Sequence, residues 1–229
     1  DVYKRQVLKG KLQYPSLQEL VMTKRLAIVG AGGHGKVVAD LAETLGWSDI
    51  HFFDDGYPGK KVLEKWLIVG DFKQLCEVHH QYDGVIVAIG NNQVRFTMLE
   101  QLQDSGAPLV SLIHPQSFVS KYALINKGVV IFANATVNAF AQLGVGAIVN
   151  VNASIDHDCI VGAAVHVCPG ANLAGGVRVA TKSWIGIGSC IIQQVTISEN
   201  VMIGAGSVVI RDVPEGMVMV GNPAKPLVK

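Results

Sequence analysis

The sequence predicts an α/β domain followed by a parallel β-helix, and two patterns carry this prediction. Between Ile113 and Val209 an aliphatic residue returns at every sixth position without interruption. Before this run, short apolar segments alternate with helical segments, and the first apolar segment leads into a glycine-rich turn. A period of six matches neither the 3.6-residue repeat of a helix nor the two-residue repeat of a strand, so it indicates a stacked structural unit.

The six-residue period describes one flat face of a triangular coil, so three faces make a coil of 18 residues. Such coils stack about 4.8 Å apart, at the spacing of neighbouring strands. The aliphatic residue points inward, and a small or β-branched residue follows it four positions later. The position directly after the aliphatic residue often holds glycine or asparagine: Gly144, Gly162, Gly186, Gly204, Asn126, Asn138 and Asn150. We expect these residues at corners, because they tolerate unusual backbone angles.

We divide the chain into a leader over residues 1–22, a Rossmann-like domain over 23–111, the β-helix over 112–214 and a tail over 215–229. The leader is interpreted as non-native or disordered, because it is unlike the apolar run that follows Met22. In the α/β domain we expect strands at 26–29, 50–53, 67–69 and 84–90, and helices ending near 45, beginning at 71 and covering 93–104. This alternation is typical of a doubly wound sheet, but the length suffices for only half of a dinucleotide-binding fold.

The composition argues against several classes of partner. The 19 basic and 18 acidic residues nearly cancel, so the charge gives no reason to expect a nucleic acid. Residues 128–155 carry no charge, but asparagines interrupt this stretch and the six-residue period explains its apolar character, so we predict no membrane insertion. The four cysteines form no CxxC pair, which favours reduced thiols in a cytoplasmic protein.

The turn with glycine at positions 30, 32 and 35 matches the dinucleotide fingerprint, with Asp54 about twenty residues further on. Such a turn brings backbone N–H groups and a helix N-terminus close to a phosphate group. Three hypotheses compete: a redox dinucleotide site, a nucleotide-sugar site, and a tight turn needed only for packing. A nucleotide-linked substrate fits best, because the chain has no second mononucleotide half and no domain for hydride transfer.

His157 is the strongest candidate for a catalytic group. It lies two positions after an inward aliphatic residue, a phase that also holds prolines, so we expect it at an outward-facing corner. One coil to either side of it are Ala139 and Gly175, which leave open space beside the ring. The neighbouring Asp158 can orient the imidazole and raise its basicity. The alternative is a solvent-exposed histidine without a role.

His166 lies half a coil from His157, so within one chain we expect it on a different face. The two histidines could then meet only across a subunit boundary, which favours a cleft between neighbouring β-helices; a lone surface histidine is the alternative. No metal site is predicted, because the histidines lack the close pairing of a zinc motif. Cys159 takes an inward position, so we expect no cysteine nucleophile and predict direct acyl transfer.

Five segments together resemble one branch of the hexapeptide-repeat acyltransferases. They are the glycine turn with His34, Phe53–Asp55, Ala88–Arg95, Asp156–Cys159 and Gly221–Lys225. The branch is the sialic acid O-acetyltransferase family, and within it the chain is most similar to bacterial UDP-4-amino-sugar N-acetyltransferases of the bacillosamine pathway. This resemblance implies that the coils are left-handed, that acetyl-CoA is the co-substrate, and that the protein forms a homotrimer with acetyl-CoA between adjacent helices.

The resemblance also implies roles for individual residues. It makes His157 the general base and Asp158 the carboxylate that increases its basicity, at a position where members often have glutamate. The residues that match nucleotide-sugar positions are Gly32, Gly33, His34, Asp54, Asp55 and Gly90. Those that match positions around acetyl-CoA are Asn150, His166, Gly175, Ile187 and Ala205. We expect backbone N–H groups of the Gly175–Gly176 corner to stabilise the tetrahedral oxyanion.

We therefore predict an acetyl-CoA-dependent acetyltransferase that acts on the amino group of a UDP-4-amino-4,6-dideoxy sugar in surface glycan biosynthesis. One alternative keeps the fold and the base but acetylates a sugar hydroxyl, as in O-acetylation of a sialic acid. Another is a non-catalytic scaffold whose first domain binds a nucleotide-sugar. The open space predicted beside His157 argues against the scaffold, which has no need of it.

Overall fold

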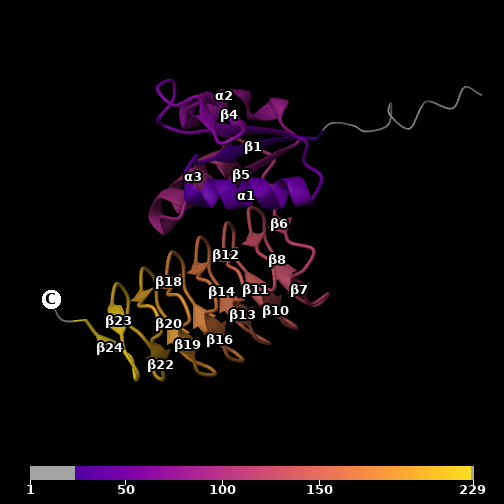
Figure 1. The fold of residues 1–229 in the computed structure, drawn as a ribbon. Helices are drawn as coiled ribbons and strands as arrows, with labels where there is room; N and C mark the ends of the chain where they lie inside the picture. The colour runs from indigo at the N-terminus through magenta and orange to yellow at the C-terminus, as the bar shows by residue number, and fades with distance from the viewer. Residues whose placement is uncertain (1–23, 228–229) are drawn as a thin grey trace, which may run out of the picture.

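The computed structural model describes residues 24–227 and contains a small α/β domain packed on a long β-helix (Figure 1). The predicted leader over residues 1–22 lies outside this range. The α/β domain contains strands β1 (Arg25–Val29), β2 (Asp49–Phe53), β3 (Val62–Leu63), β4 (Trp66–Gly70) and β5 (Gly84–Val87), helices α1 (Gly33–Thr44), α2 (Phe72–Val78) and α3 (Asn92–Asp104), and the short 3-10 helix η1 (His79–Gln81). The predicted strands and helices are present, and β3 is an addition that pairs antiparallel with β4 at the sheet edge.

The sheet has the order β3-β4-β2-β1-β5, and its strands other than β3 run parallel. One face packs on α1, with Leu26 and Phe52 against Val38, and the opposite face packs on α2 and α3. The chain adds β2 and β4 on one side of β1 and then returns to place β5 on the other side. Doubly wound sheets bind ligands outside the carboxyl ends of the strands at such a reversal, so the ends of β1 and β5 mark the expected position.

The second half of the chain is a left-handed parallel β-helix with three sheets of short strands, which have two residues each except for the three-residue β23. One sheet contains β6 (Leu112–Ile113), β9 (Val130–Ile131), β12 (Ile148–Val149), β15 (His166–Val167), β18 (Trp184–Ile185) and β21 (Met202–Ile203), and ends with β23 (Val218–Val220) and β24 (Lys225–Pro226). The second contains β7 (Phe118–Val119), β10 (Thr136–Val137), β13 (Ser154–Ile155), β16 (Asn172–Leu173), β19 (Cys190–Ile191) and β22 (Val208–Val209). The third contains β8 (Leu124–Ile125), β11 (Gln142–Leu143), β14 (Ile160–Val161), β17 (Arg178–Val179) and β20 (Thr196–Ile197).

The aliphatic residues of the six-residue repeat form the core of this β-helix. Those from Ile131 to Val209 are buried in one continuous cluster, while Ile113, Val119 and Ile125 in the first coil are only partly covered. Each strand pairs in parallel with the strand one coil later, as Val149 does with Val167. The repeat therefore specified both the inward positions and the vertical register, as predicted.

The corners have a regularity of their own. A left-handed backbone, with φ between 50° and 72°, recurs at every sixth residue: Gly128, Asn134, Phe140, Gly146, Asn152, Asp158, Ala164, Gly170, Gly176, Lys182, Gly188, Gln194, Asn200 and Gly206. These residues lie three positions after the aliphatic residue, so the corner slot predicted one position after it was wrong. Glycine at that earlier slot serves close packing between coils, because a Cβ atom on Gly144 would lie 2.5 Å from the backbone nitrogen of Ala163.

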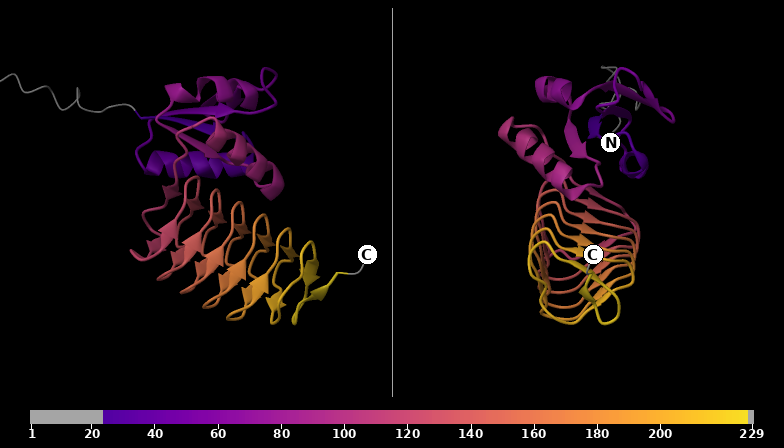
Figure 2. Two further views of the ribbon diagram at one scale, coloured as in Figure 1. Left: turned by 180° about the vertical axis from the view of Figure 1, so that it is seen from behind. Right: turned by 90° about the vertical axis from the view of Figure 1, so that its left-hand side faces the viewer.

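The two domains share a hydrophobic contact. Outward-facing residues of the first coils, including Val130, Phe132 and Ile148, belong to the same buried cluster as α1 and the sheet. The α/β domain thus sits over the early coils, and the later coils extend beyond it (Figure 2). This contact fixes the carboxyl edge of the sheet relative to the β-helix.

Candidate active site

His157 lies at the corner between β13 and β14, where its side chain is 61% exposed. Its Nδ1 atom is 2.8 Å from Oδ2 of Asp158. The hydrogen bond with Asp158, followed by the charge of Asp156, raises the pKa of the imidazole above its ordinary value. Asp158 has the left-handed φ of 60° that recurs at these corners, a conformation that aspartate adopts more readily than most residues. The corner therefore directs Nε2 away from Asp158, as a general base requires.

The predicted vertical neighbours of His157 are confirmed. The ring covers Gly175 so closely that a Cβ atom there would lie 2.6 Å from both Cε1 and Nε2. On the other side, the backbone N–H of Asp158 donates to the carbonyl of Ala139 at 3.1 Å. Position 175 must therefore lack a side chain for the imidazole to keep this place.

Two further residues hold this corner, and neither was predicted to have a role. Oδ1 of Asp156 accepts a hydrogen bond from the backbone N–H of His157 at 2.7 Å and another from Nδ2 of Asn138 at 2.9 Å. The Asn138 bond, followed by the His157 backbone bond, lowers the pKa of Asp156. Asn138 precedes Asp156 by 18 residues, which is the length of one coil. Counting one coil back from Asp156 would therefore have identified this contact from the sequence.

At the corner expected to stabilise an oxyanion, one of the two backbone N–H groups is already bonded. The backbone N–H of Gly176 donates to the carbonyl of His157 at 2.9 Å, so it is not free for a substrate. The N–H of Gly175, in contrast, donates to no acceptor within residues 24–227. One backbone donor, beside the imidazole, thus remains for a developing negative charge.

His166 does not lie on an open surface. It is 6% exposed and faces the α/β domain, with its ring centroid 4.4 Å from that of Trp184 and 6.0 Å from that of His34. Nε2 of His166 is 3.1 Å from Nδ2 of Asn150. Burial, followed by the charge of Arg95, lowers the pKa of His166 to about 3 and that of His34 to about 4. Both imidazoles are therefore neutral, and His166 is a buried residue of the domain contact rather than a lone surface histidine.

Of the other residues predicted to surround acetyl-CoA, Gly175 lies beside His157, whereas Ile187 and Ala205 lie on a different corner. Ile187 and Ala205 are exposed and stacked, since Gly206 next to Ala205 donates its N–H to the carbonyl of Ile187 at 2.8 Å. This corner joins the sheet that contains His166 to the sheet that contains β13, whereas His157 stands at the next corner along the coil. One chain therefore does not bring the two groups of residues together.

The predicted nucleotide-sugar residues gather at the carboxyl ends of β1, β2 and β5. A Cβ atom at Gly32, Gly33 or Gly90 would meet nothing within 4 Å, so these glycines border open space. Asp54 supports the turn, because Oδ2 accepts from the N–H of Ala31 at 2.7 Å and Oδ1 from the N–H of Gly56 at 3.0 Å. The adjacent Asp55 is exposed.

Arg95 ties this edge to the β-helix, a role that the sequence did not reveal. Its guanidinium is 1% exposed, and its hydrogen bonds at 2.7–3.2 Å go to the carbonyls of Ile89, Gly90, Gly146 and Ala164 and to Oδ1 of Asn92. Nδ2 of Asn92 in turn donates to the carbonyls of Lys182 and Ser183 at 3.0 Å. Burial lowers the pKa of Arg95 to about 9. The turn at Gly90 is thus held against the same corner in three successive coils of the β-helix.

Two of the four cysteines are buried in the β-helix. Cys159 is fully buried in the core, and Cys168 is buried and its pKa is raised to about 12 by burial. Within residues 24–227 no group of three histidine, cysteine or acidic side chains could hold a metal ion. In the same residues no helix is both long and apolar enough to cross a membrane.

Comparison with known proteins gives consistent similarities over both domains. Residues 25–102 match the family model of the PglD N-terminal domain. A UDP-N-acetylbacillosamine N-acetyltransferase of Bacillus subtilis (strain 168) is 36% identical over 115 residues, which are 48% of this chain and 52% of that protein. The chain thus aligns with about half the length of this curated relative.

Two solved structures match over nearly their whole length. The acetyltransferase domain of PglB from Neisseria gonorrhoeae FA1090, in complex with acetyl coenzyme A, has a TM-score of 0.85 at 43% identity, covering 90% of this chain and 100% of that chain. PerB from Caulobacter crescentus, in complex with CoA and GDP-perosamine, has a TM-score of 0.84 at 36% identity, covering 89% and 97% of the respective chains.

Proposed function

Because the chain belongs to the family of hexapeptide-repeat nucleotide-sugar N-acetyltransferases, we propose that it transfers the acetyl group of acetyl-CoA to the 4-amino group of a UDP-4-amino-4,6-dideoxy sugar. The observation that carries this proposal is the His157 imidazole, which lies on Gly175 and is bonded through Nδ1 to Asp158. This arrangement leaves Nε2 as the atom that accepts a proton. The acetyl-CoA and GDP-perosamine complexes of the relatives support the two substrate classes.

The reaction we propose is a direct transfer in a ternary complex. The neutral amine of the sugar attacks the thioester carbonyl, so that a C–N bond forms, and Nε2 of His157 accepts the proton that the nitrogen loses. The tetrahedral intermediate then collapses, the C–S bond breaks, and His157 returns the proton to the CoA thiolate. Asp158 stabilises the imidazolium between these steps, because its carboxylate accepts the hydrogen bond from Nδ1. The free N–H of Gly175 supports an interaction with the oxyanion.

On the acceptor side, we assign the nucleotide-sugar to the turns that follow β1 and β5. Gly32, Gly33 and Gly90 border open space there, and the N-terminus of α1 favours a phosphate group. His34 and Asp55 flank the same edge, while Asp54 holds the turn in shape. We expect the reaction in the cytoplasm, where acetyl-CoA and nucleotide-sugars are made.

We also propose a homotrimer with acetyl-CoA in the groove between adjacent subunits. The corner that holds His157 has an exposed apolar cluster in the two preceding coils: Phe118, Tyr122, Leu124 and Phe140, each more than half exposed. Tyr122 and Phe140 stack with ring centroids 5.4 Å apart. A neighbouring copy that covers this cluster would bring its own Asn150, His166, Ile187 and Ala205 toward His157, which one chain does not do.

The test is the release of CoA thiol from acetyl-CoA in the presence of different acceptors. Turnover with a UDP-4-amino-4,6-dideoxy sugar, abolished in His157→Ala, is expected. Turnover only with free or CMP-linked sialic acid would keep the base but shift the reaction to O-acetylation, and binding without any turnover would favour a scaffold. Sedimentation of wild type and of Phe140→Asp tests the assembly, since a monomeric wild type contradicts the trimer.

A further inference from the structure

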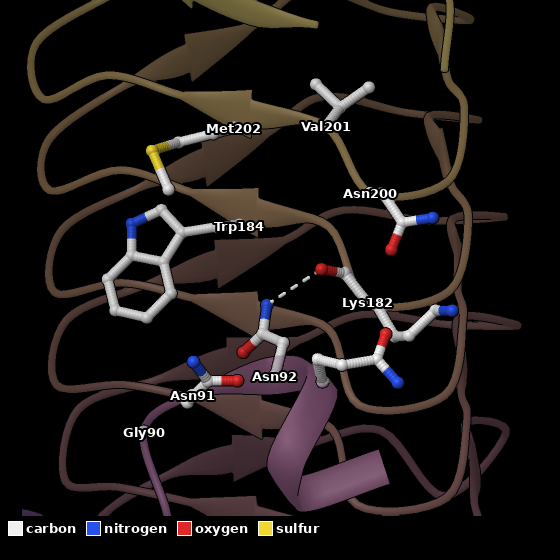
Figure 3. A pocket seen from close by; sticks show the side chains of 9 residues that line it. Gly90, Asn91, Asn92, Lys182, Trp184, Asn200, Val201 and Met202 are labelled. Carbon is white, nitrogen blue, oxygen red and sulfur yellow. Dashed lines mark hydrogen bonds between the residues drawn. The ribbon is translucent and has the colours of Figure 1, made fainter. Parts of the chain in front are cut away.

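A cavity of about 450 Å³ opens where the N-terminus of α3 faces the later coils of the β-helix. Its lining residues are Gly90, Asn91, Asn92, Gln93, Lys182, Trp184, Asn200, Val201 and Met202 (Figure 3). One wall comes from the turn after β5, and the other comes from strands β18 and β21 with the corners before them. The two walls thus belong to different domains.

The charged groups that line this cavity are positive only. Lys182 is its one ionisable lining residue, and no carboxylate lines the cavity. Within residues 24–227 the Lys182 ammonium forms no ion pair, and it lies 5.3 Å from the centroid of the Phe96 ring. The other polar lining groups are the asparagine and glutamine side chains at the start of α3 and Asn200 on the β-helix wall. Such a lining favours an anion with several acceptor atoms.

The strands of the β-helix wall add an apolar surface, which continues toward the glycine turn. Met202 is 50% exposed, and the ring of Trp184 lies between it and His166, whose ring is 4.4 Å away. His166 contacts His34 on the glycine turn. The turns themselves adjoin, because a Cβ atom on Gly30 would lie 2.8 Å from the Ile89 side chain. A ligand bound at the two turns can therefore extend into this cavity without leaving the protein surface.

The cavity is held open by buried hydrogen bonds. Asn92, which is 8% exposed, bonds the α3 wall to the carbonyls of Lys182 and Ser183 in the opposite wall. The buried guanidinium of Arg95 donates hydrogen bonds to Oδ1 of Asn92 and to the Gly90 carbonyl. Because both walls are linked without a ligand, the site is pre-organised.

We propose that this cavity binds the distal phosphate of the nucleotide-sugar, with the Lys182 ammonium on its oxygens and the attached sugar against Trp184 and Met202. This proposal rests on the function proposed above and extends it to residues outside the two glycine turns. The continuity with Gly90 and Gly30 favours the nucleotide-sugar over the phosphates of CoA as the source of the anion.

The test compares UDP with UMP, which lacks the distal phosphate, by titration calorimetry. Lys182→Gln suits the backbone, because Gln194, at the same position of another corner, has a φ of 62° and Lys182 has one of 64°. We expect Lys182→Gln to weaken UDP binding about tenfold and to leave UMP binding unchanged, while Lys182→Arg keeps most of the affinity. The exposed Lys73→Gln on α2 is the matched control and should bind both nucleotides like wild type.

Three results would overturn the proposal: equal UDP affinity in wild type and Lys182→Gln, no UDP binding by wild type, or a loss of CoA affinity in place of UDP affinity. Circular dichroism of each variant shows that it is folded. If the UDP and UMP pattern holds while no amino sugar is acetylated, the cavity assignment stands and the proposed acceptor is wrong. The two proposals therefore fail independently.

Discussion

Gly175→Ala tests whether the placement of the His157 ring governs catalysis. The backbone of Gly175 is not left-handed, so alanine fits it without strain. The added Cβ would lie 2.6 Å from Cε1 and Nε2, whereas ordinary contacts begin near 3.4 Å. The ring must therefore move by about 0.8 Å, the difference between these two distances, and a displacement of about 1 Å at a reacting centre can lower a rate about 100-fold.

The exposure of His157 separates this effect from stability. Its side chain is 61% exposed and can swing into solvent, so the fold has no need to change. We expect kcat to fall about 100-fold while the midpoint of thermal unfolding stays within about 2 °C of wild type. Gly144→Ala is the contrasting variant, because its Cβ would meet the backbone nitrogen of Ala163 at 2.5 Å and should destabilise the β-helix.

The assay measures CoA thiol release over a range of acetyl-CoA concentrations. If Gly175 serves mainly to make room for acetyl-CoA, Gly175→Ala will raise the KM for acetyl-CoA and leave kcat nearly unchanged. That outcome, or wild-type activity, would refute the argument from ring placement. A loss of kcat with an unchanged KM supports it.

Three further predictions concern charge and burial. Asp158→Asn retains an acceptor for Nδ1 of His157 and suits the left-handed backbone, but it removes the carboxylate whose hydrogen bond is the largest cause of the raised His157 pKa. The acidic limb of the kcat–pH profile, where protonated His157 cannot act as a base, should therefore move to lower pH, and an unmoved limb would contradict the pairing. Arg95→Met should lower the free energy of unfolding in urea by about 3 kcal/mol, because four backbone carbonyls lose a buried donor. Arg95→Lys should recover only part of this free energy. A loss below about 1 kcal/mol in Arg95→Met would show that these hydrogen bonds between the domains are dispensable. Burial lowers the pKa of His34 to about 4 and that of His166 to about 3, whereas the same side chains in the unfolded chain take up protons near pH 6.5. The free energy of unfolding should therefore be full above about pH 6.5 and fall as the pH drops toward about 4. The expected slope is up to about 1.4 kcal/mol per pH unit for each histidine. Thermal melts at pH 7, 6 and 5 should show a smaller slope in His166→Gln, and an equal slope would mean that other groups cause it.

The left-handed backbone of the corners explains why an aspartate can stand next to His157. Asp158 occupies the slot where a left-handed backbone recurs at every coil, and its carboxylate reaches Nδ1 of His157 directly from there. Phe140, one coil earlier in the same slot, has a φ of 62°, which is unfavourable for a bulky side chain. An exposed aromatic residue in this conformation is consistent with the subunit contact proposed for this corner.

The sequence by itself determined the β-helix and the immediate surroundings of His157. In stacked coils of one length, vertical neighbours follow from counting, so Ala139, Gly175 and the buried Cys159 could all be placed from their residue numbers alone. The strands and helices of the α/β domain could be predicted for a similar reason, since hydrophobic periodicity depends only on local backbone geometry.

Only the tertiary structure decided how the two domains meet. The burial of His166 against His34, and the hydrogen bonds from Arg95 to Gly146 and Ala164, depend on the placement of one domain on the other. No periodicity encodes that placement, and backbone carbonyls carry no sequence signature, because every residue has one. The sequence therefore placed the residues around His157, and the structure revealed what holds the carboxyl edge of the α/β sheet beside the β-helix.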